Sequence, residues 1–326
     1  MSKKNSSRST PKKNTDQINQ ERFVTEKFEQ AVNNFSDLSD TELIGNGNFG
    51  IVVSAPDNTD SLTKLVFKGY NQPTDKYARL SFERETLIYR SFRDNPIKDI
   101  VTPVLIGEAE EIENGDFVGR FTMTRVPGKC FALKWGEEAD NEFLEQRAKF
   151  YENAGRALAQ FHMNAKPENF PPPDPDKGYD GAQVHTVSIL KEETNQALKK
   201  VDEFLQRNLI SGVIHGDFHN GNILVDENLD ITGLIDFGMC AYSPNIMIDF
   251  AAVPADELEN FISSYEKERG IDIPRDMVTV SHLSFNTEYL KYLQENDKDN
   301  ATEITGAITN INKHLNDLIH ITNFKP

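Results

Sequence analysis

Short apolar runs separated by turn residues dominate the first third of the chain. Ile51–Val53 and Leu65–Phe67 are two such runs, rich in β-branched or aromatic side chains, and this composition is typical of paired strands. Between residues 77 and 92 the apolar positions recur at spacings of three and four, which predicts a helix. Strand-like runs then resume near residues 101–107 and 117–126. The pattern therefore predicts an antiparallel sheet with one accompanying helix.

Helical periodicity takes over after Pro127-Gly128, a dipeptide that ends regular structure. Helices are predicted at 143–163, 187–209 and from 256 to the end, with brief strands at 223–225 and 234–235. This change of pattern near Val126 predicts two lobes. The division expected from the sequence is a basic tail over residues 1–20, a first lobe over 21–126 and a helical second lobe over 127–326.

Charge and apolar content restrict the class of protein. Residues 1–13 contain five basic and no acidic side chains, whereas the whole chain has 35 basic and 52 acidic residues, a net charge of −17. Such a balance disfavours binding to nucleic acid and favours a cationic partner, although it is also typical of a surface kept charged for solubility. The sequence has no apolar run of transmembrane length and no apolar leader, so we expect a cytoplasmic protein without a membrane span.

A glycine-rich loop lies in the strand region. Gly45, Gly47 and Gly50 are followed by Val52 in the pattern G-x-G-x-x-G-x-V. Glycines allow backbone amides to approach phosphate oxygens closely, so this loop is a candidate phosphate site. No helix begins within the glycines and no Gly-Lys-Ser/Thr follows, which disfavours a dinucleotide fold and a Walker A loop. An ordinary hairpin is the alternative.

Two charged residues follow at the positions that a nucleotide site requires. Lys68 ends the strand after the glycine loop and is a candidate ligand of the α- and β-phosphates, with Lys64 as the competitor. Glu85 shares the apolar face of the next helix and is the preferred ion-pair partner of that lysine, whereas Glu83 is the fallback. Each of these residues taken alone is more often an ordinary surface charge.

The most specific pattern comes later in the chain. His215-Gly-Asp217-Phe-His219-Asn-Gly-Asn222 precedes Ile235-Asp236-Phe-Gly. This arrangement resembles the catalytic and metal-binding loops of the aminoglycoside/choline phosphotransferase family, which belongs to the protein-kinase-like superfamily. The resemblance covers roughly residues 40–255 and implies an α+β, protein-kinase-like bilobal fold.

The resemblance also implies a role for each residue of this block. Asp217 would be the base that orients the attacking hydroxyl, and Asn222 and Asp236 would hold Mg²⁺ against the phosphates of ATP or GTP. His219 would touch the γ-phosphate, and main-chain groups of Thr124 and Val126 would meet the nucleotide base. A zinc hydrolase built on the alternating His and Asp residues is a weaker alternative, because it leaves the asparagine and Asp-Phe-Gly unexplained.

The acceptor is expected to be a small-molecule alcohol. Only ten residues separate Asp-Phe-Gly from Asp249, and no Ala-Pro-Glu follows, so the long segment that supports a peptide in protein kinases is missing. A protein or lipid kinase on the same fold and a nucleotide-binding pseudokinase scaffold are the alternatives. In the family that the sequence resembles, the helices after the metal loop form the acceptor pocket, so a set of acidic residues there could recruit an amine, although solvated helix faces are the more common explanation: Asp256, Glu257, Glu259, Glu266 and Glu268.

Overall fold

The computed structural model describes eight stretches of the chain, which are residues 43–47, 50–55, 58–67, 76–114, 116–131, 141–170, 183–296 and 300–321. The predicted tail at residues 1–20 and Lys68 lie outside them. The chain groups into two compact units, one of residues 1–82 and 106–125 and the other of residues 83–105 and 126–326. Within the described stretches, no helix has the length and apolar character to cross a membrane.

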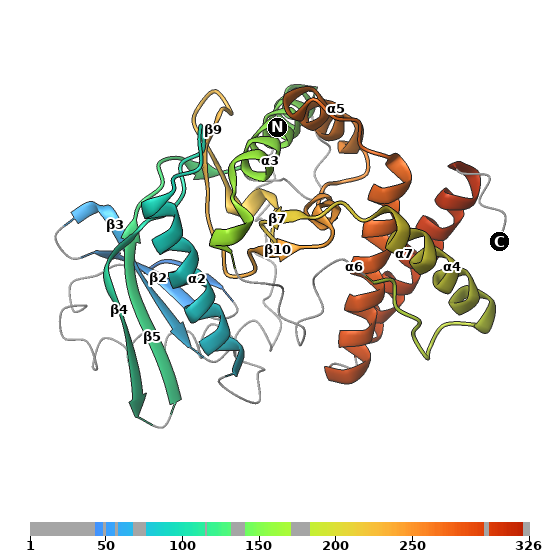
Figure 1. Ribbon diagram of the computed structural model, residues 1–326, viewed down its shortest axis with the longest axis horizontal. Coiled ribbons are helices and arrows are strands. Elements are labelled where there is room, and N and C mark those ends of the chain that lie inside the picture. Colours follow the sequence, from blue (N-terminus) through green and yellow to red (C-terminus); the bar gives the residue numbers. More distant parts are fainter. Residues whose placement is uncertain are drawn as a thin grey trace, which may run out of the picture. The chain divides into compact units, whose positions relative to one another are not determined.

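The first unit is built on a five-stranded sheet (Figure 1). Its strand order is β1 (Leu43–Gly47), β2 (Gly50–Ala55), β3 (Asn58–Phe67), β5 (Asp116–Thr124) and β4 (Leu105–Asn114). The pairs β1–β2, β2–β3 and β3–β5 are antiparallel. Ile51, Val53 and Leu65 are fully buried, because alternate residues of a strand point to the same face. The predicted antiparallel sheet is confirmed.

Helix α2 (Lys76–Asp94) is shared between the two units. In the first unit, Phe82 packs against Phe121 with ring centroids 6.0 Å apart. In the second unit, Phe92 packs edge-on against Phe237 at 4.7 Å. The sequence-based division assigned Glu83–Leu105 to the first lobe, whereas these residues group with the second unit.

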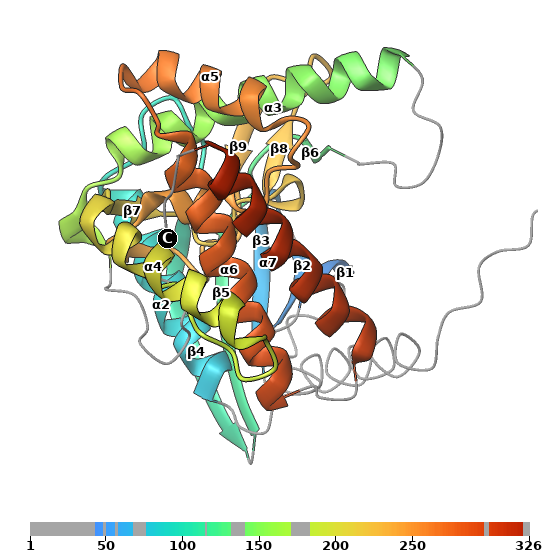
Figure 2. The same cartoon turned by 90° about the vertical axis from the view of Figure 1, so that its right-hand side faces the viewer.

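The second unit is mainly helical, with α3 (Asn141–Asn164), α4 (Glu192–Asn208), α5 (Leu258–Arg269), α6 (Arg275–Asn296) and α7 (Ala301–Ile321). Helix α3 lies along α5, and α6 lies along α7 (Figure 2). The close approach of α3 to α5 requires Gly155, since a Cβ there would lie 2.3 Å from the carbonyl oxygen of Phe261. The predicted α+β class is confirmed.

Short strands and single-turn helices connect these long helices. The strands are β6 (Lys129–Cys130), β7 (Gly212–Ile214), β8 (Ile223–Val225), β9 (Ile231–Leu234) and β10 (Ala241–Ser243), and the 3-10 helices are η2 (Pro167–Asn169), η3 (Asn220–Asn222) and η4 (Ile246–Phe250). Strand β7 pairs with β10, and β8 pairs with both β6 and β9. The loops at the ends of β7, β8 and β9 carry the residues of the predicted catalytic block.

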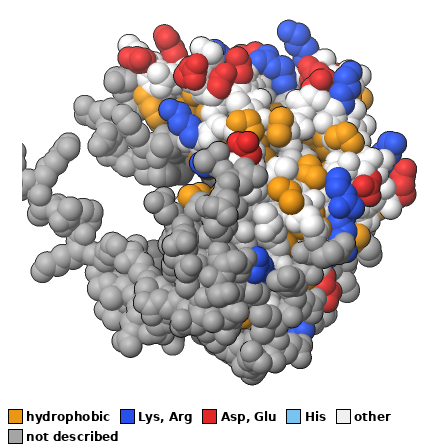
Figure 3. Space-filling view, turned by 90° about the vertical axis from the view of Figure 1, so that its left-hand side faces the viewer, with side chains coloured by type: hydrophobic (Ala, Val, Ile, Leu, Met, Phe, Trp, Pro, Cys, Tyr) orange, Lys and Arg blue, Asp and Glu red, His pale blue; other side chains and the backbone are white. Residues whose placement is uncertain are grey.

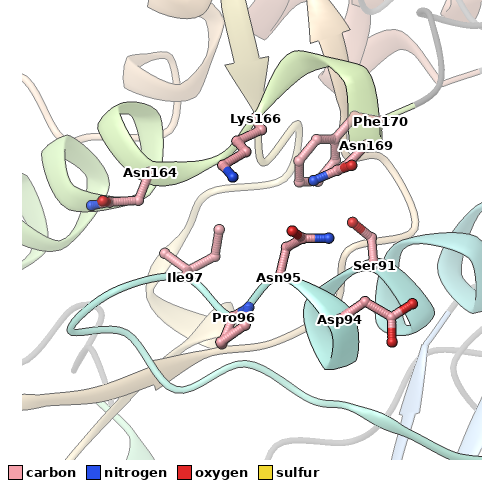
Figure 4. A pocket seen from close by; sticks show the side chains of 9 residues that line it. All are labelled: Ser91, Asp94, Asn95, Pro96, Ile97, Asn164, Lys166, Asn169 and Phe170. Atoms are coloured by element: carbon pink, nitrogen blue, oxygen red, sulfur yellow. The ribbon is translucent and has the colours of Figure 1, made fainter.

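Two surface features complete the description. On the face shown in Figure 3, acidic and basic side chains are interspersed on the coloured part, without one broad region of a single sign. A pocket of about 250 Å³ opens on the second unit where α2 and α3 end, and Lys166, Asn95 and Phe170 are among its lining residues (Figure 4). No residue of the predicted catalytic block lines this pocket.

Candidate functional site

A tight turn after β7 presents Asp217 to solvent. His215 is fully buried, and Gly216 has φ = +80°, a conformation that glycine adopts without strain. A Cβ at Gly216 would also lie 2.4 Å from the carbonyl oxygen of Met239, so no other residue fits. The side chain of Asp217 is 46% exposed. The turn therefore anchors one residue in the core and leaves a carboxylate accessible two positions later.

Asn222 is the residue that fixes the position of Asp217. Its Nδ2 donates to the backbone oxygen of Asp217 at 2.9 Å and to the carboxylate Oδ2 at 3.0 Å. Asn222 is buried at the end of η3. Since Nδ2 has two hydrogens and Asp217 takes both, the amide is oriented and its Oδ1 is turned to the opposite side. An oriented amide oxygen is a suitable ligand for a hard cation such as Mg²⁺.

His219 lies beside the same carboxylate oxygen, and its Nε2 is 3.2 Å from Asn222 Nδ2. Its Nδ1 accepts from the backbone N–H of Gly221 at 3.0 Å, and its Nε2 is 3.6 Å from Asp217 Oδ2. The interaction with Asp217 raises the pKa of His219, burial opposes the shift, and the charge of Asp236 adds to it. Because Nδ1 is an acceptor, the neutral ring carries its proton on Nε2, and the charged ring carries one there as well. The edge near Asp217 is therefore a donor.

Asp236 is brought to the same region by the loop after β9. The backbone N–H of Ile235 donates to the carbonyl of Asn222 at 3.0 Å, which ties the two loops together. Asp236 is exposed and has φ = +62°, a left-handed conformation that aspartate tolerates better than most residues. Its negative charge acts on the pKa values of both His215 and His219. The loop that carries Asp236 is thus joined by a backbone hydrogen bond to Asn222, the residue that contacts Asp217.

Buried rings hold the Asp236 loop in place. Phe237 is fully buried, and its ring centroid lies 4.7 Å from that of Phe92 and 4.6 Å from that of His215. His215 Nε2 also bonds to the carbonyl of Ile235 at 3.0 Å, and burial lowers the pKa of this histidine. A neutral His215 with Nε2–H donating satisfies both observations. His215 therefore braces the loop that carries Asp236.

Asp249 holds the backbone of the segment after β7, residues 215–222, which is called the catalytic turn below. Its two carboxylate oxygens accept from the backbone N–H groups of His215 at 2.7 Å and Gly216 at 2.8 Å. It lies on η4, whose start is capped by Asn245 through a bond from Met247 N–H at 3.1 Å. Charge-assisted bonds to backbone amides are among the stronger hydrogen bonds, so this carboxylate fixes the backbone that carries Asp217.

Glu85 is also part of the second unit. It is fully buried on α2, whereas the fallback Glu83 is exposed. The hydroxyl of Tyr89 donates to Glu85 Oε1 at 2.7 Å. Burial raises the pKa of Tyr89, and the charges of Glu85 and Asp236 raise it further. The predicted pairing of Glu85 with Lys68 stays a prediction, because Lys68 is outside the described residues.

The remaining predicted residues belong to the first unit or to the connection after it. Gly45, Gly47 and Gly50 lie on the antiparallel pair β1–β2, in which Gly45 faces Val52. The glycines therefore lie on a hairpin and do not begin a helix, which agrees with the expectation from the sequence. Thr124 ends β5 and is counted with the first unit, and Val126 is buried in the second.

Sequence reasoning missed two contacts that hold the catalytic turn. The thiol of Cys130 on β6 donates to the carbonyl of Gly221 at 3.0 Å, and Asn220 Nδ2 donates to the carbonyl of Phe131 at 3.1 Å. Both join residues about 90 positions apart in the chain. Nothing in the local sequence around Cys130 predicts such a contact, because it depends on the pairing of β6 with β8.

The acidic residues suggested for substrate recruitment have partners within the chain. Arg147 bonds to Asp256 and Glu257, and Arg275 bonds to Glu259 and Glu266. Gln160 Nε2 donates to Glu268. In the described stretches, no group of three or more His, Cys, Asp or Glu side chains is arranged to hold a metal ion. The zinc alternative therefore has no ligand set there.

Comparison with protein families identifies this architecture. A family model described as a phosphotransferase enzyme family matches residues 57–275, more than half of the chain. The chain belongs to this phosphotransferase family. The match covers both loops of the catalytic block and includes Asp249. The family resemblance and the enzyme class expected from the sequence are confirmed.

Solved structures confirm the kinase-like fold. The GDP and kanamycin complex of the aminoglycoside phosphotransferase APH(2″)-IIIa has a TM-score of 0.63 at 16% identity, over 90% of this chain and 99% of that chain. Macrolide 2′-phosphotransferase type I has 0.56 at 15%, over 88% and 96%. APH(3″)-Id from Streptomyces rimosus with ADP and streptomycin has 0.51 at 19%, over 81% and 98%. None of the curated proteins compared with the chain matches its sequence. The chain is therefore a phosphotransferase with a kinase-like fold.

Proposed function

We propose that the protein transfers the γ-phosphoryl group of ATP or GTP to a hydroxyl group of a small molecule, with Asp217 as the base. The observation that carries this proposal is the double bond from Asn222 Nδ2 to the backbone oxygen and the carboxylate of Asp217. It holds the carboxylate in one orientation while leaving it 46% exposed. A fixed and accessible carboxylate is suited to orient an alcohol and accept its proton.

Mg²⁺ fits the oxygen atoms that the site presents. Asn222 Oδ1, which its amide orientation turns away from Asp217, and the exposed carboxylate of Asp236 would hold the ion. When bound, the ion would offset negative charge on the phosphates. Every ligand in this set is an oxygen, which matches the preference of Mg²⁺ rather than that of zinc.

The other residues of the site would act on the nucleotide. The protonated Nε2 edge of His219 would donate to a γ-phosphate oxygen. Glycines 45, 47 and 50 and Lys68 would contact the phosphates, and Glu85, held by Tyr89, would keep that lysine extended. Main-chain groups of Thr124 and Val126 would meet the base. The GDP and ADP named in the solved complexes support a purine nucleotide for this chain.

The acceptor is proposed to be an alcohol that also carries amine groups. Kanamycin and streptomycin are bound in two of the similar structures. The net charge of −17 would attract a polycation at low salt. A macrolide enzyme of the same fold broadens the class, so a screen must include both types of antibiotic as well as choline-like amines, sugars and proteins.

Thermal shift and a transfer screen test the proposal in order. Melting temperature is measured with ATP and with GTP, each with and without Mg²⁺; we expect a rise that needs both nucleotide and metal. Phosphate transfer is then measured over the acceptor panel. Transfer to a protein but to no small molecule would contradict the proposed acceptor, and no metal-dependent shift with either nucleotide would contradict the proposed site.

A further inference from the structure

A line of four polar side chains connects the end of α5 with the catalytic turn. Arg269 Nη1 donates to the hydroxyl oxygen of Tyr265. Tyr265 Oη lies 2.7 Å from His162 Nδ1, and His162 Nε2 lies 3.0 Å from Asp249 Oδ2. Tyr265 is fully buried, and His162 and Asp249 are nearly so. None of these contacts involves the residues proposed to act on the nucleotide or the acceptor.

The direction of each bond in this line is determined by its two ends. A guanidinium group only donates, and a carboxylate only accepts. Asp249 therefore requires N–H on His162 Nε2, and a neutral His162 must then accept on Nδ1, which the hydroxyl of Tyr265 satisfies. Burial lowers the pKa of His162, in agreement with a neutral ring. In each of the three hydrogen bonds, the donor is therefore the partner on the Arg269 side and the acceptor is the partner on the Asp249 side.

Asp249 divides its two oxygens among three donors. Oδ1 accepts from Gly216 N–H, and Oδ2 accepts from both His215 N–H and His162 Nε2. A rotation of this carboxylate would break the bonds to both backbone amides at once. Gly216 has φ = +80°, and the next residue is Asp217. The orientation of the Asp249 carboxylate therefore affects the direction in which Asp217 points.

We propose that Tyr265 is a positioning residue for the catalytic turn, which acts on Asp217 through His162 and Asp249. The inference rests on the proposed role of Asp217. Without the Tyr265 hydroxyl, His162 Nδ1 becomes a buried acceptor that has lost its donor, and such a group is costly to keep in place. The His162 imidazole and the Asp249 carboxylate are then expected to shift. The N–H groups of His215 and Gly216 lose an acceptor whose position was fixed.

Tyr265→Phe isolates this effect from packing. The ring of Tyr265 packs against Phe250 with centroids 5.0 Å apart, and phenylalanine keeps that contact. Tyr151→Phe is the matched control, since Tyr151 is a buried tyrosine of α3 in the same unit whose hydroxyl is not part of the line. Arg269→Gln weakens the line from its surface end and leaves the buried side chains intact.

Two measurements apply to each variant of the full chain. Hydrogen exchange is followed at the amides of His215 and Gly216, a readout that needs no substrate. Release of ADP or GDP is followed with kanamycin as the acceptor probe and, without acceptor, as slow hydrolysis by water. For Tyr265→Phe we expect faster exchange at both amides and a kcat about fivefold lower, as the loss of one hydrogen bond implies, with the KM for nucleotide unchanged. Arg269→Gln should shift both readouts in the same direction by less.

Exchange at wild-type rates in Tyr265→Phe, or an equal change in Tyr151→Phe, would overturn the inference. So would an unchanged kcat in Tyr265→Phe. Asp217→Asn separates this inference from the proposed function: if Asp217→Asn abolishes turnover while Tyr265→Phe leaves it intact, only the role of Tyr265 fails. If Asp217→Asn retains full turnover, the proposed base is wrong and the catalytic part of this inference fails with it, whatever the exchange rates show.

Discussion

Two groups of acidic side chains in the second unit have opposite surroundings. The α5 acidic cluster is defined as Asp256, Glu257, Glu259, Glu266 and Glu268, and four of these five residues pair with Arg147 or Arg275. The second group is the proposed catalytic pair, Asp217 and Asp236. Asp217 is held by the amide of Asn222 and flanked by His219.

The partner of a carboxylate decides whether its negative charge is neutralised or kept. A carboxylate paired with a guanidinium group is neutralised locally and cannot easily attract a second cation. A carboxylate held by the N–H of a neutral amide is fixed in space but keeps its negative charge, which is what a base or a metal ligand needs. We therefore expect the first group to contribute mainly to stability and the proposed catalytic pair to chemistry, and substitutions in the two groups should separate these effects.

The largest expected effect is on turnover in Asp217→Asn. The amide keeps the size of the side chain but cannot accept a proton, so we expect kcat to fall about 10³-fold, within the range found for general bases. The side chain is 46% exposed, so the free energy of unfolding should change little. Turnover with a screened acceptor and unfolding in urea measure the two quantities. A comparable loss of stability would mean that Asp217 is structural and would remove the contrast between the groups.

The second-largest effect is expected for Asp236→Asn, on the apparent affinity for Mg²⁺. Asparagine tolerates the φ of +62° as well as aspartate does, so the backbone should be preserved. Loss of the charge should weaken the apparent affinity for Mg²⁺ in the presence of nucleotide by about 10- to 100-fold, the size of effect seen when a metal site loses one partner. Titration of Mg²⁺ at fixed ATP or GTP, followed by melting temperature, gives this affinity. An unchanged midpoint would exclude Asp236 as a ligand.

The fold could be predicted from the sequence, and a candidate catalytic block could be proposed from it, for physical reasons. Phosphate and metal contacts require particular residue types at short spacings, as between Asp217 and Asn222, and apolar periodicity predicted α2 and the sheet. What could not be predicted depends on long-range packing. Cys130 and Gly221 meet only because β6 pairs with β8. The arginine partners of the α5 acidic cluster are equally distant, since Arg147 lies about 110 residues from Glu257.

Within the α5 acidic cluster, Glu257→Gln should have the larger effect on stability. Glu257 has a side chain only 6% exposed and accepts from Arg147 Nε at 2.7 Å and from Asn260 at 3.2 Å. Removing its charge leaves the guanidinium group with a poorer partner in a buried place, and we expect a loss of about 2 kcal/mol in the free energy of unfolding. Kcat should be unchanged.

Asp256→Asn is the matched control for Glu257→Gln, because both residues bind the same arginine. The Asp256 side chain is 63% exposed, so its loss should cost about 0.5 kcal/mol or less. Urea unfolding of both variants gives the comparison. Equal losses would show that burial does not set the strength of these pairs, and a fall in kcat for Glu257→Gln would assign the cluster a part in catalysis.

Arg275→Met is expected to destabilise the fold less than Glu257→Gln, and the size of its effect depends on pH. Hydrogen bonding to Arg275 lowers the pKa of Glu266 below its ordinary value of 4.5, and burial partly opposes this shift. A carboxylate whose pKa is lower in the folded state stabilises the fold fully above pH 4.5, and this contribution disappears as the pH falls through the lower folded value. Because Arg275 is partly exposed, we expect the variant to lose about 1 kcal/mol at pH 7. Urea unfolding of both proteins from pH 7 downward should show the gap narrowing below pH 4.5; a gap that stays constant or widens there would mean that Arg275 stabilises the chain through the packing of its aliphatic stem and not through the charge of Glu266.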